Sequence, residues 1–168
     1  KDGWKSSLMD QDEFSKIAQS VYPLHPSTFS VLPYFFRRLA QNERSIFAFL
    51  TSLEPFGFQE FLSQNTISAY FRLPDLFDYL LANFQGRIFT SGRARILSET
   101  SDRLETINNL TDLDIKIIKS IGLLNWMIEI TNINATNQLI ISALIEPSVT
   151  KHQINKSIDK LKSQNDIV

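Results

Sequence analysis

Residues 22–44 include the side chains best suited to bind a charged ligand. His25 stands between two prolines that restrain its backbone, and Arg38 and Arg44 follow with further hydrogen-bond donors around a predicted helix junction. A guanidinium can hold a phosphate or a carboxylate through two hydrogen bonds. These residue types therefore fit an anion site. The alternative is a purely structural corner, in which Glu43 and neighbouring acids pair with the arginines.

A second group of polar side chains lies near the C-terminus, on a predicted helix. Its members carry positive charge or amide groups: Lys151, His152, Gln153, Asn155, Lys156, Lys160 and Lys162. Asp159 and Asp166 offset part of this charge and leave a local net charge of about +2, enough for weak contact with phosphates. The two amide side chains could read base edges. The alternative is a solvated helix face or a surface that docks a protein.

The motifs of common enzymes are missing from the sequence. The five glycines are scattered, so no phosphate-binding loop is expected. His25 and His152 lie far apart and the chain has no cysteine, which argues against a metal site. Asp75 and Asp78 share one helix face, but acids at a helix start usually complement the helix dipole. We therefore expect no catalytic residues, no metal and no cofactor in this chain.

Composition predicts a globular, soluble chain. It has 168 residues, of which 43% are hydrophobic, and a formal net charge of −1. That balance supports a packed core and predicts no overall attraction to nucleic acid, so any DNA contact would need a local patch. No apolar run approaches the roughly 20 residues that cross a bilayer, and the lack of cysteine fits a reducing compartment. We expect a cytoplasmic protein without membrane contact.

The spacing of apolar residues predicts an all-α fold. An acidic capping pattern, prolines at helix starts and the Glu54-Pro55-Phe56-Gly57 turn set the boundaries in the first two thirds. The helices expected there cover residues 10–22, 26–40, 43–53, 59–64, 74–88 and 92–110, with Asn42 as an N-cap and Pro33 as a kink or break. The thirteen phenylalanines concentrate between Phe14 and Phe89 and predict a dense aromatic core.

The last third changes character, because isoleucine, asparagine and threonine replace phenylalanine. Asp112 or Asp114 could cap a first helix, which includes the apolar run 126–130, and two shorter helices follow on either side of Pro147. Three short helices of this kind outline a helix-turn-helix unit, and residues 166–168 stand where a winged helix would begin its wing. We predict a Phe-rich subdomain over residues 1–110 and a helix-turn-helix or truncated winged-helix subdomain over 111–168.

The chain ends suggest a piece of a longer polypeptide. Lys1 opens the chain without a methionine, and Ile167 and Val168 form an apolar pair that we expect to continue into another element.

A family resemblance supports this interpretation. The run YPLHPSTFSVLPYFFRRLAQNERSIFAFLTSLEPFGF, residues 22–58, resembles a segment of large bacterial P-loop ATPases of the AAA+/STAND type, many of which look like defence or conflict-system proteins. In them a YPLHP-like stretch and a QNER-plus-aromatic helix follow the ATPase core. LPDLFDY at 73–79 is similar to a later element of that architecture, and residues 154–168 are similar to the end of its winged helix. The Walker motifs are absent here, so the resemblance implies a helical lid and winged-helix region without its motor.

The resemblance also implies a role for the first polar group. A lid arginine could sense the nucleotide phosphates, with Arg44 and Arg38 as candidates and His25 as a nearby contact. ATP and Mg²⁺ would belong to the parent protein, whose own ATPase core would be the main partner of this chain. A protein partner, or DNA, would be contacted as the nucleotide state changes.

Two functional hypotheses follow from the sequence. The preferred one is a non-catalytic regulatory or interaction fragment of a larger ATPase, which couples nucleotide state to partner or DNA contacts. The alternative is a stand-alone DNA-binding helix-turn-helix protein with a helical dimerisation region. A scaffold or oligomerisation domain without a ligand is a third reading.

Overall fold

The fold was established from a computed structural model, which describes residues 16, 19–39, 46–88 and 94–164. Its helices are α2 (Pro26–Leu39), α3 (Ile46–Thr51), α4 (Phe58–Gln64), α5 (Leu73–Ile88), α6 (Ala94–Thr106), α7 (Asp112–Thr131), α8 (Asn137–Leu144) and α9 (Lys151–Ser163). The only β-type pairings in these ranges are two isolated bridges, Leu24 with Phe71 and Glu146 with Val149. The predicted all-α class is confirmed.

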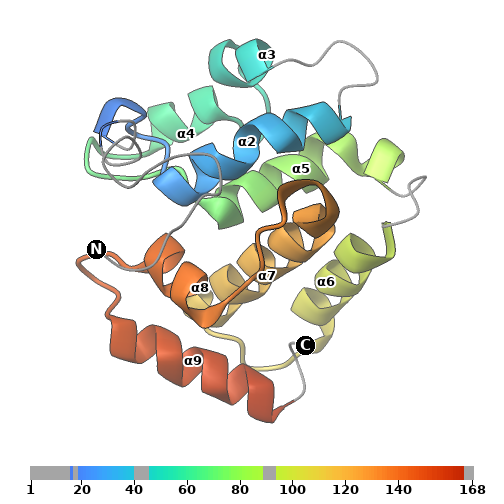
Figure 1. Ribbon diagram of the computed structural model, residues 1–168, viewed down its shortest axis with the longest axis vertical. Coiled ribbons are helices and arrows are strands. Elements are labelled where there is room, and N and C mark those ends of the chain that lie inside the picture. The colour runs from blue at the N-terminus through green and yellow to red at the C-terminus, as the bar shows by residue number, and fades with distance from the viewer. Residues whose placement is uncertain (1–15, 17–18, 40–45, 89–93, 165–168) are drawn as a thin grey trace.

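Helix α7 occupies the centre of the molecule. It packs against α2, α5, α6, α8 and α9. Its buried side chains come from most directions around the helix axis, among them Ile117, Leu124 and Trp126. In Figure 1, α3 and α4 lie at one end of the molecule and α9 lies at the other, with α7 between them. The two ends are therefore separate surfaces supported by one central helix.

Most predicted helix boundaries agree with the structure. Helix α2 begins at Pro26 and continues through Pro33, whose side chain is exposed. The run 126–130 continues α7 as expected, and α6 is shorter than predicted. The Glu54–Gly57 turn is closed by a hydrogen bond from the Gly57 N–H to the Glu54 carbonyl at 2.8 Å. The predicted cap Asn42 and most of the helix expected at 10–22 lie outside the described residues.

The start of α7 differs from the prediction. Thr111, rather than Asp112 or Asp114, is the N-cap, and its hydroxyl accepts a hydrogen bond from the Asp114 N–H. The Asp114 carboxylate accepts in return from the Thr111 N–H, which completes a capping box. A hydroxyl followed three residues later by an acid was present in the sequence, but two adjacent acids masked it.

The predicted aromatic core is present. Phe35, Phe49, Phe71 and Tyr79 have no exposed surface, and their rings meet at tilted or edge-to-face angles. Ring centroids of Phe49 and Tyr79 are 4.9 Å apart, within the range of favourable aromatic pairs. Phe35 also meets Trp126 of α7 at 6.1 Å. The buried residues on both sides of the 110/111 boundary therefore belong to one cluster.

The helix predicted over residues 43–53 does not bury all of its apolar side chains. Ile46, Phe47, Phe49, Leu50 and Leu53 recur in it at helical spacing, yet Phe47 is 73% exposed and Leu53 is 83% exposed. Residues two apart on a helix point about 200° from each other, so Phe47 cannot join Phe49 in the core. Leu53 lies beyond the end of α3 at Thr51. This part of the molecule therefore leaves large apolar side chains in solvent.

Candidate functional site

Helix α9 bears most of the polar residues that the sequence singled out, and its inner side fixes it to the rest of the fold. Ile154, Ile158 and Leu161 follow one another at four- and three-residue steps, and all three are buried. At its start, the Thr150 hydroxyl accepts from the Gln153 N–H while the Gln153 side chain accepts from the Thr150 N–H. Gln153, a candidate base reader, is therefore part of a capping box.

The inner side of α9 also surrounds a buried carboxylate on α7. The Asp114 side chain accepts hydrogen bonds from the Ser157 hydroxyl, from Lys160 Nζ at 2.8 Å and from the Thr111 N–H at 2.9 Å. Asp114 is 1% exposed. Lys160, predicted as a nucleic-acid or partner contact, thus neutralises a buried charge inside the fold. No short-range sequence pattern links residues 114 and 160, so this pair was not foreseeable.

The surroundings of Asp114 keep it ionised. Burial alone raises the pKa of its carboxyl group, but the hydrogen bonds from Lys160, Ser157 and Thr111 outweigh burial and hold that pKa at about 2. The carboxylate is therefore charged in the folded protein at neutral pH. It couples the start of α7 to the second half of α9.

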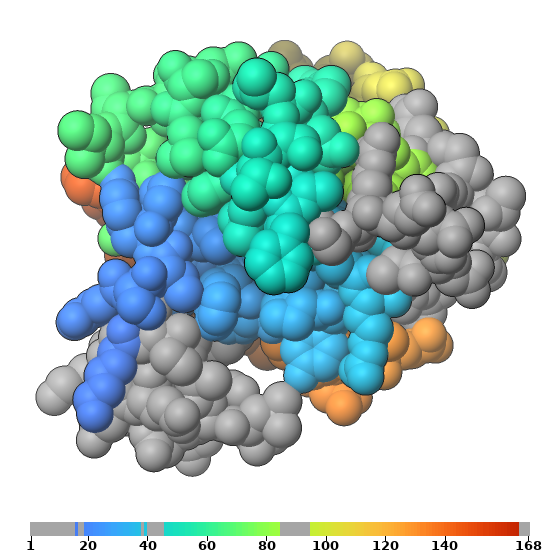
Figure 2. Space-filling model, turned by 90° about the horizontal axis from the view of Figure 1, so that it is seen from above, coloured from blue at the N-terminus to red at the C-terminus, as the bar shows by residue number. Residues whose placement is uncertain are grey.

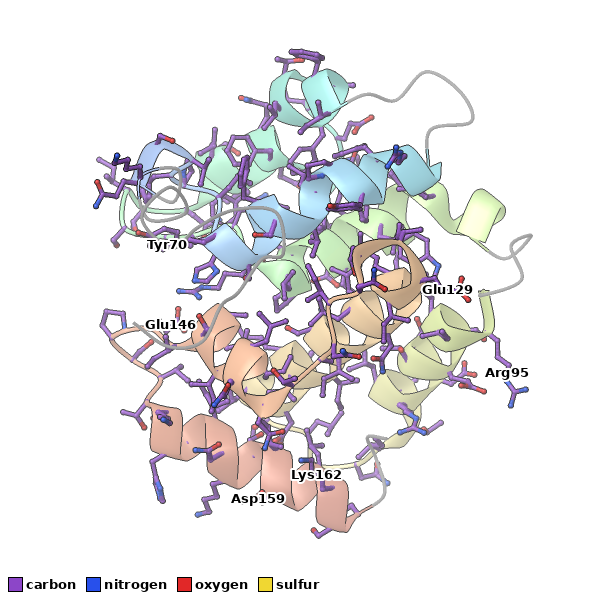
Figure 3. The ribbon with its side chains drawn as sticks, in the orientation of Figure 1. Tyr70, Arg95, Glu129, Glu146, Asp159 and Lys162 are labelled. Atoms are coloured by element: carbon purple, nitrogen blue, oxygen red, sulfur yellow. The ribbon has the colours of Figure 1, made fainter. Side chains whose placement is uncertain are left out.

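The outer side of α9 carries the remaining candidates. Lys151, His152 and Lys156 are exposed, whereas Asn155 is half-buried. Two further exposed charges, Asp159 and Lys162, lie on the same helix at the end of the molecule farthest from α3 (Figure 3). Lys151 and Lys156 therefore place positive charge on the exposed side of α9, and Asp159 offsets part of it.

The connection before α9 is tight. Glu146 and Val149 exchange backbone hydrogen bonds of 3.2 and 2.9 Å, which closes the turn between α8 and α9. Lys162 in the last turn of α9 donates to Asn137, the first residue of α8, at 3.1 Å. The two helices consequently run side by side in opposite directions. The residues of the predicted wing, 166–168, lie outside the described residues.

His25 is held inside the fold at the start of α2. Its backbone N–H donates to the Phe71 carbonyl at 2.9 Å, and its Nδ1 lies 2.8 Å from the Ser27 hydroxyl. Burial, assisted by the charge of Arg72, lowers the pKa of His25 to about 3. The imidazole is therefore neutral at physiological pH and supplies no positive charge for a phosphate.

The structure does not bring His25 and Arg38, two of the predicted nucleotide-sensing residues, close together. His25 precedes α2 and Arg38 lies in its last turn, so the helix rise separates them by roughly 20 Å. Arg37 is exposed, whereas the Arg38 side chain and all of Arg44 lie outside the described residues. Their predicted contact with a nucleotide stays a prediction.

Arg72 is a structural residue that the sequence did not reveal. Its guanidinium donates to the carbonyls of Ala143 and Ile145 at the end of α8, and it lies 5.6 Å from the centre of the Tyr70 ring. This arrangement ties the segment before α5 to the α8–α9 turn. A lone arginine between Phe71 and Leu73 carries no recognisable signal, because its partners are more than seventy residues away.

Asp75 and Asp78 make different contacts in the fold. The Asp75 carboxylate accepts from the Arg72 N–H at 2.6 Å in the first turn of α5. Asp78 pairs with Lys119 of α7 at 2.7 Å. Within the ranges that the structure describes, no group of three acidic, histidine or cysteine side chains could hold a metal ion, and no helix is long and apolar enough to cross a membrane.

Comparison with known proteins yields no relative: no family model, no curated protein and no solved structure matches this chain.

We expect Asp114→Asn to lower the free energy of unfolding at pH 7 by about 2 to 3 kcal/mol, since the carboxyl pKa rises from about 2 to 3.8 on unfolding. The folded pKa is depressed, so this stabilisation is present above pH 4 and is lost between about pH 4 and pH 2. Urea denaturation of both proteins from pH 7 to pH 2.5 measures it. Asp159→Asn, on the exposed side of α9, is the control. An equal loss in the control would contradict the role of Asp114.

We expect His25 to make stability fall as the pH is lowered from 6.5 toward 3. The unfolded chain takes up a proton near pH 6.5, whereas folded His25 remains neutral until about pH 3. The stability difference between the natural chain and His25→Asn should therefore shrink by up to about 1.4 kcal/mol per pH unit. Denaturation curves between pH 7.5 and 4 measure it, and a constant difference would show that His25 titrates normally.

Proposed function

We propose that this chain is a non-catalytic interaction module whose contact element is α9. The observation that supports it is the contrast between the two sides of this helix. Its inner side is fixed by buried isoleucines and by the Asp114–Lys160 ion pair at 2.8 Å. Its outer side presents Lys151, His152 and Lys156 to solvent.

Fixing the helix matters for binding. A contact surface that is already ordered loses less conformational freedom when a partner arrives, so more of the interaction energy appears as affinity. Lysine side chains then supply compact positive charges that neutralise phosphates and release counterions. An anionic partner, with a nucleic-acid backbone as the first candidate, is the chemical class that suits this surface.

The charge balance predicts modest affinity. Asp159 stands on the same exposed side, and Lys160 is already neutralised by Asp114. The surface therefore offers fewer free charges than the sequence suggested. Weak, salt-sensitive binding is the behaviour we expect of it.

The resemblance to AAA+/STAND ATPases supports a wider setting for this module. In that setting the chain is a helical lid region of a larger bacterial P-loop ATPase, of the kind found among defence proteins. The ATPase core of the parent would bind ATP and Mg²⁺. Changes in its nucleotide state would then move the module that bears α9 toward or away from its partner.

The anion-binding role of α9 can be tested with duplex DNA. Replacing Lys151 and Lys156 by alanine should weaken binding of a fluorescent 20-base-pair duplex and lower the slope of log affinity against log salt by about 2. Anisotropy titrations at 50 to 200 mM NaCl measure both. The matched control replaces Lys16 and Arg95, which are exposed cations on other parts of the surface. Absence of binding at micromolar protein and 50 mM salt, or equal effects of both pairs, would rule out this role.

The nucleotide-sensing role has a separate test. In the full-length ATPase, Arg44→Ala or Arg38→Ala should lower ATP turnover by roughly tenfold or more, because charge stabilising the terminal phosphate would be lost. Steady-state ATP hydrolysis is measured for each variant. Arg37→Ala, which alters the exposed neighbour, serves as the control. Turnover that is unchanged in both variants would remove the sensor hypothesis.

A further inference from the structure

Exposed apolar side chains concentrate in one short part of the chain. Eight large hydrophobic residues are exposed among the described residues, and six of them fall between positions 47 and 70. These six are Phe47, Leu53, Phe56, Leu62, Ile67 and Tyr70. Isolated exposed apolar residues are ordinary, but such a concentration typically marks an interaction surface.

These residues belong to elements that form one end of the molecule. Helix α3 packs on α4 through Phe49 and Phe58, whose ring centroids are 5.7 Å apart, and Gln59 donates to the Leu50 carbonyl. Figure 2 shows α3, the turn after it and α4 side by side on the face seen from above. We call the exposed side chains of residues 46–70 on this face the α3–α4 surface.

The charge of this surface has one sign. Residues 46–70 contain no lysine, arginine or histidine, and Glu54 and Glu60 are their only charged residues. Next to them, Asp75 and Asp78 of α5 line a depression of about 110 Å³. The aromatic residues Phe56, Phe61 and Phe71 form its apolar walls. An apolar surface is therefore bordered by carboxylates.

Among the described residues, three carboxylates and no basic side chain line the depression: Glu60, Asp75 and Asp78. Lys119 pairs with Asp78 from α7, and the Asp75 carboxylate accepts a hydrogen bond from the Arg72 N–H. Burial, with a further contribution from the neighbouring Asp78, raises the pKa of Asp75 to about 6, even though the Arg72 N–H and the charges of Lys116 and Arg72 oppose the shift. A cation entering the depression would be attracted by these carboxylates.

We propose that the α3–α4 surface docks a basic amphipathic helix of a partner protein. Apolar side chains of that helix would cover Phe47, Leu53 and Phe56, and a lysine or arginine would reach the carboxylates of the depression. This is helix-in-groove recognition with charge complementarity.

Charge selects this occupant over the others. A second copy of the chain presenting the same surface would bring Glu54 and Glu60 against their own counterparts, and like charges across an interface are unfavourable. Nucleic acids and anionic lipid surfaces are repelled for the same reason. The surface lies at the opposite end of the molecule from α9 (Figure 1), so this inference does not depend on the anion-binding role of α9.

Binding can be measured with designed peptides and the complete 168-residue chain. The probe is a fluorescent 18-residue peptide with leucines on one helix face and lysines on the other. One comparison peptide has glutamates in place of the lysines, and another has the same composition in an order that is not amphipathic. Anisotropy should show binding of the first peptide and at least tenfold weaker binding of both comparison peptides. Equal binding of the amphipathic peptide and of the peptide with the same composition in a non-amphipathic order would overturn the proposal.

Single substitutions locate the binding surface. Phe47→Ser and Leu53→Ser should each weaken binding at least fivefold, with little change in stability because both side chains are exposed. Ile145→Ser removes a similarly exposed apolar side chain at the α8–α9 turn and should leave binding unchanged. Glu60→Gln should weaken binding and reduce its salt dependence, whereas Glu99→Gln on α6 should not.

Sedimentation velocity tests whether a second copy of the chain occupies the α3–α4 surface instead of a partner helix. We expect a monomer at the concentrations of the titration. A dimer that Leu53→Ser dissociates would identify a second copy as the natural occupant and overturn the proposal. Unchanged peptide binding by Phe47→Ser and Leu53→Ser would do the same.

Discussion

Burial of α7 on most of its circumference is the constraint on which the arrangement of the other helices depends. A helix that is apolar nearly all round is stable only when neighbours cover it, and α2, α5, α6, α8 and α9 provide that cover. Gly122 shows how close the contact is, because a Cβ atom there would lie 2.5 Å from the Thr100 side chain on α6. The central helix therefore sets the positions of both ends of the molecule.

The two ends of the molecule expose different kinds of side chain because their helices pack differently against the core. At one end α9 is amphipathic, so it buries its isoleucines and leaves lysines in solvent. At the other end, α3 and α4 bury Phe49 and Phe58, whereas Phe47 of α3 and Leu53 and Phe56 of the following turn stay exposed. A basic surface and an acidic apolar surface result, on a chain whose formal net charge is only −1. Net charge alone conceals this separation.

Much of the fold followed from local patterns, and the errors have physical causes. Apolar spacing placed α5 and α9, and prolines placed the start of α2, since these signals act over a few residues. Capping by Thr111 was missed because two aspartates stood beside it. The exposure of Phe47 could not be read from the sequence, because hydrophobicity says nothing about which side of a short helix has a neighbour.

The sequence by itself determined the helical class, the aromatic core and the absence of common catalytic motifs, because composition and short-range periodicity decide these properties. Only the tertiary structure decided what individual polar residues do. Lys160 became the partner of buried Asp114, and His25 became neutral beside Ser27 and Arg72. In both cases the charge state depends on burial and on hydrogen-bond partners, and these are set by packing between segments distant in the chain.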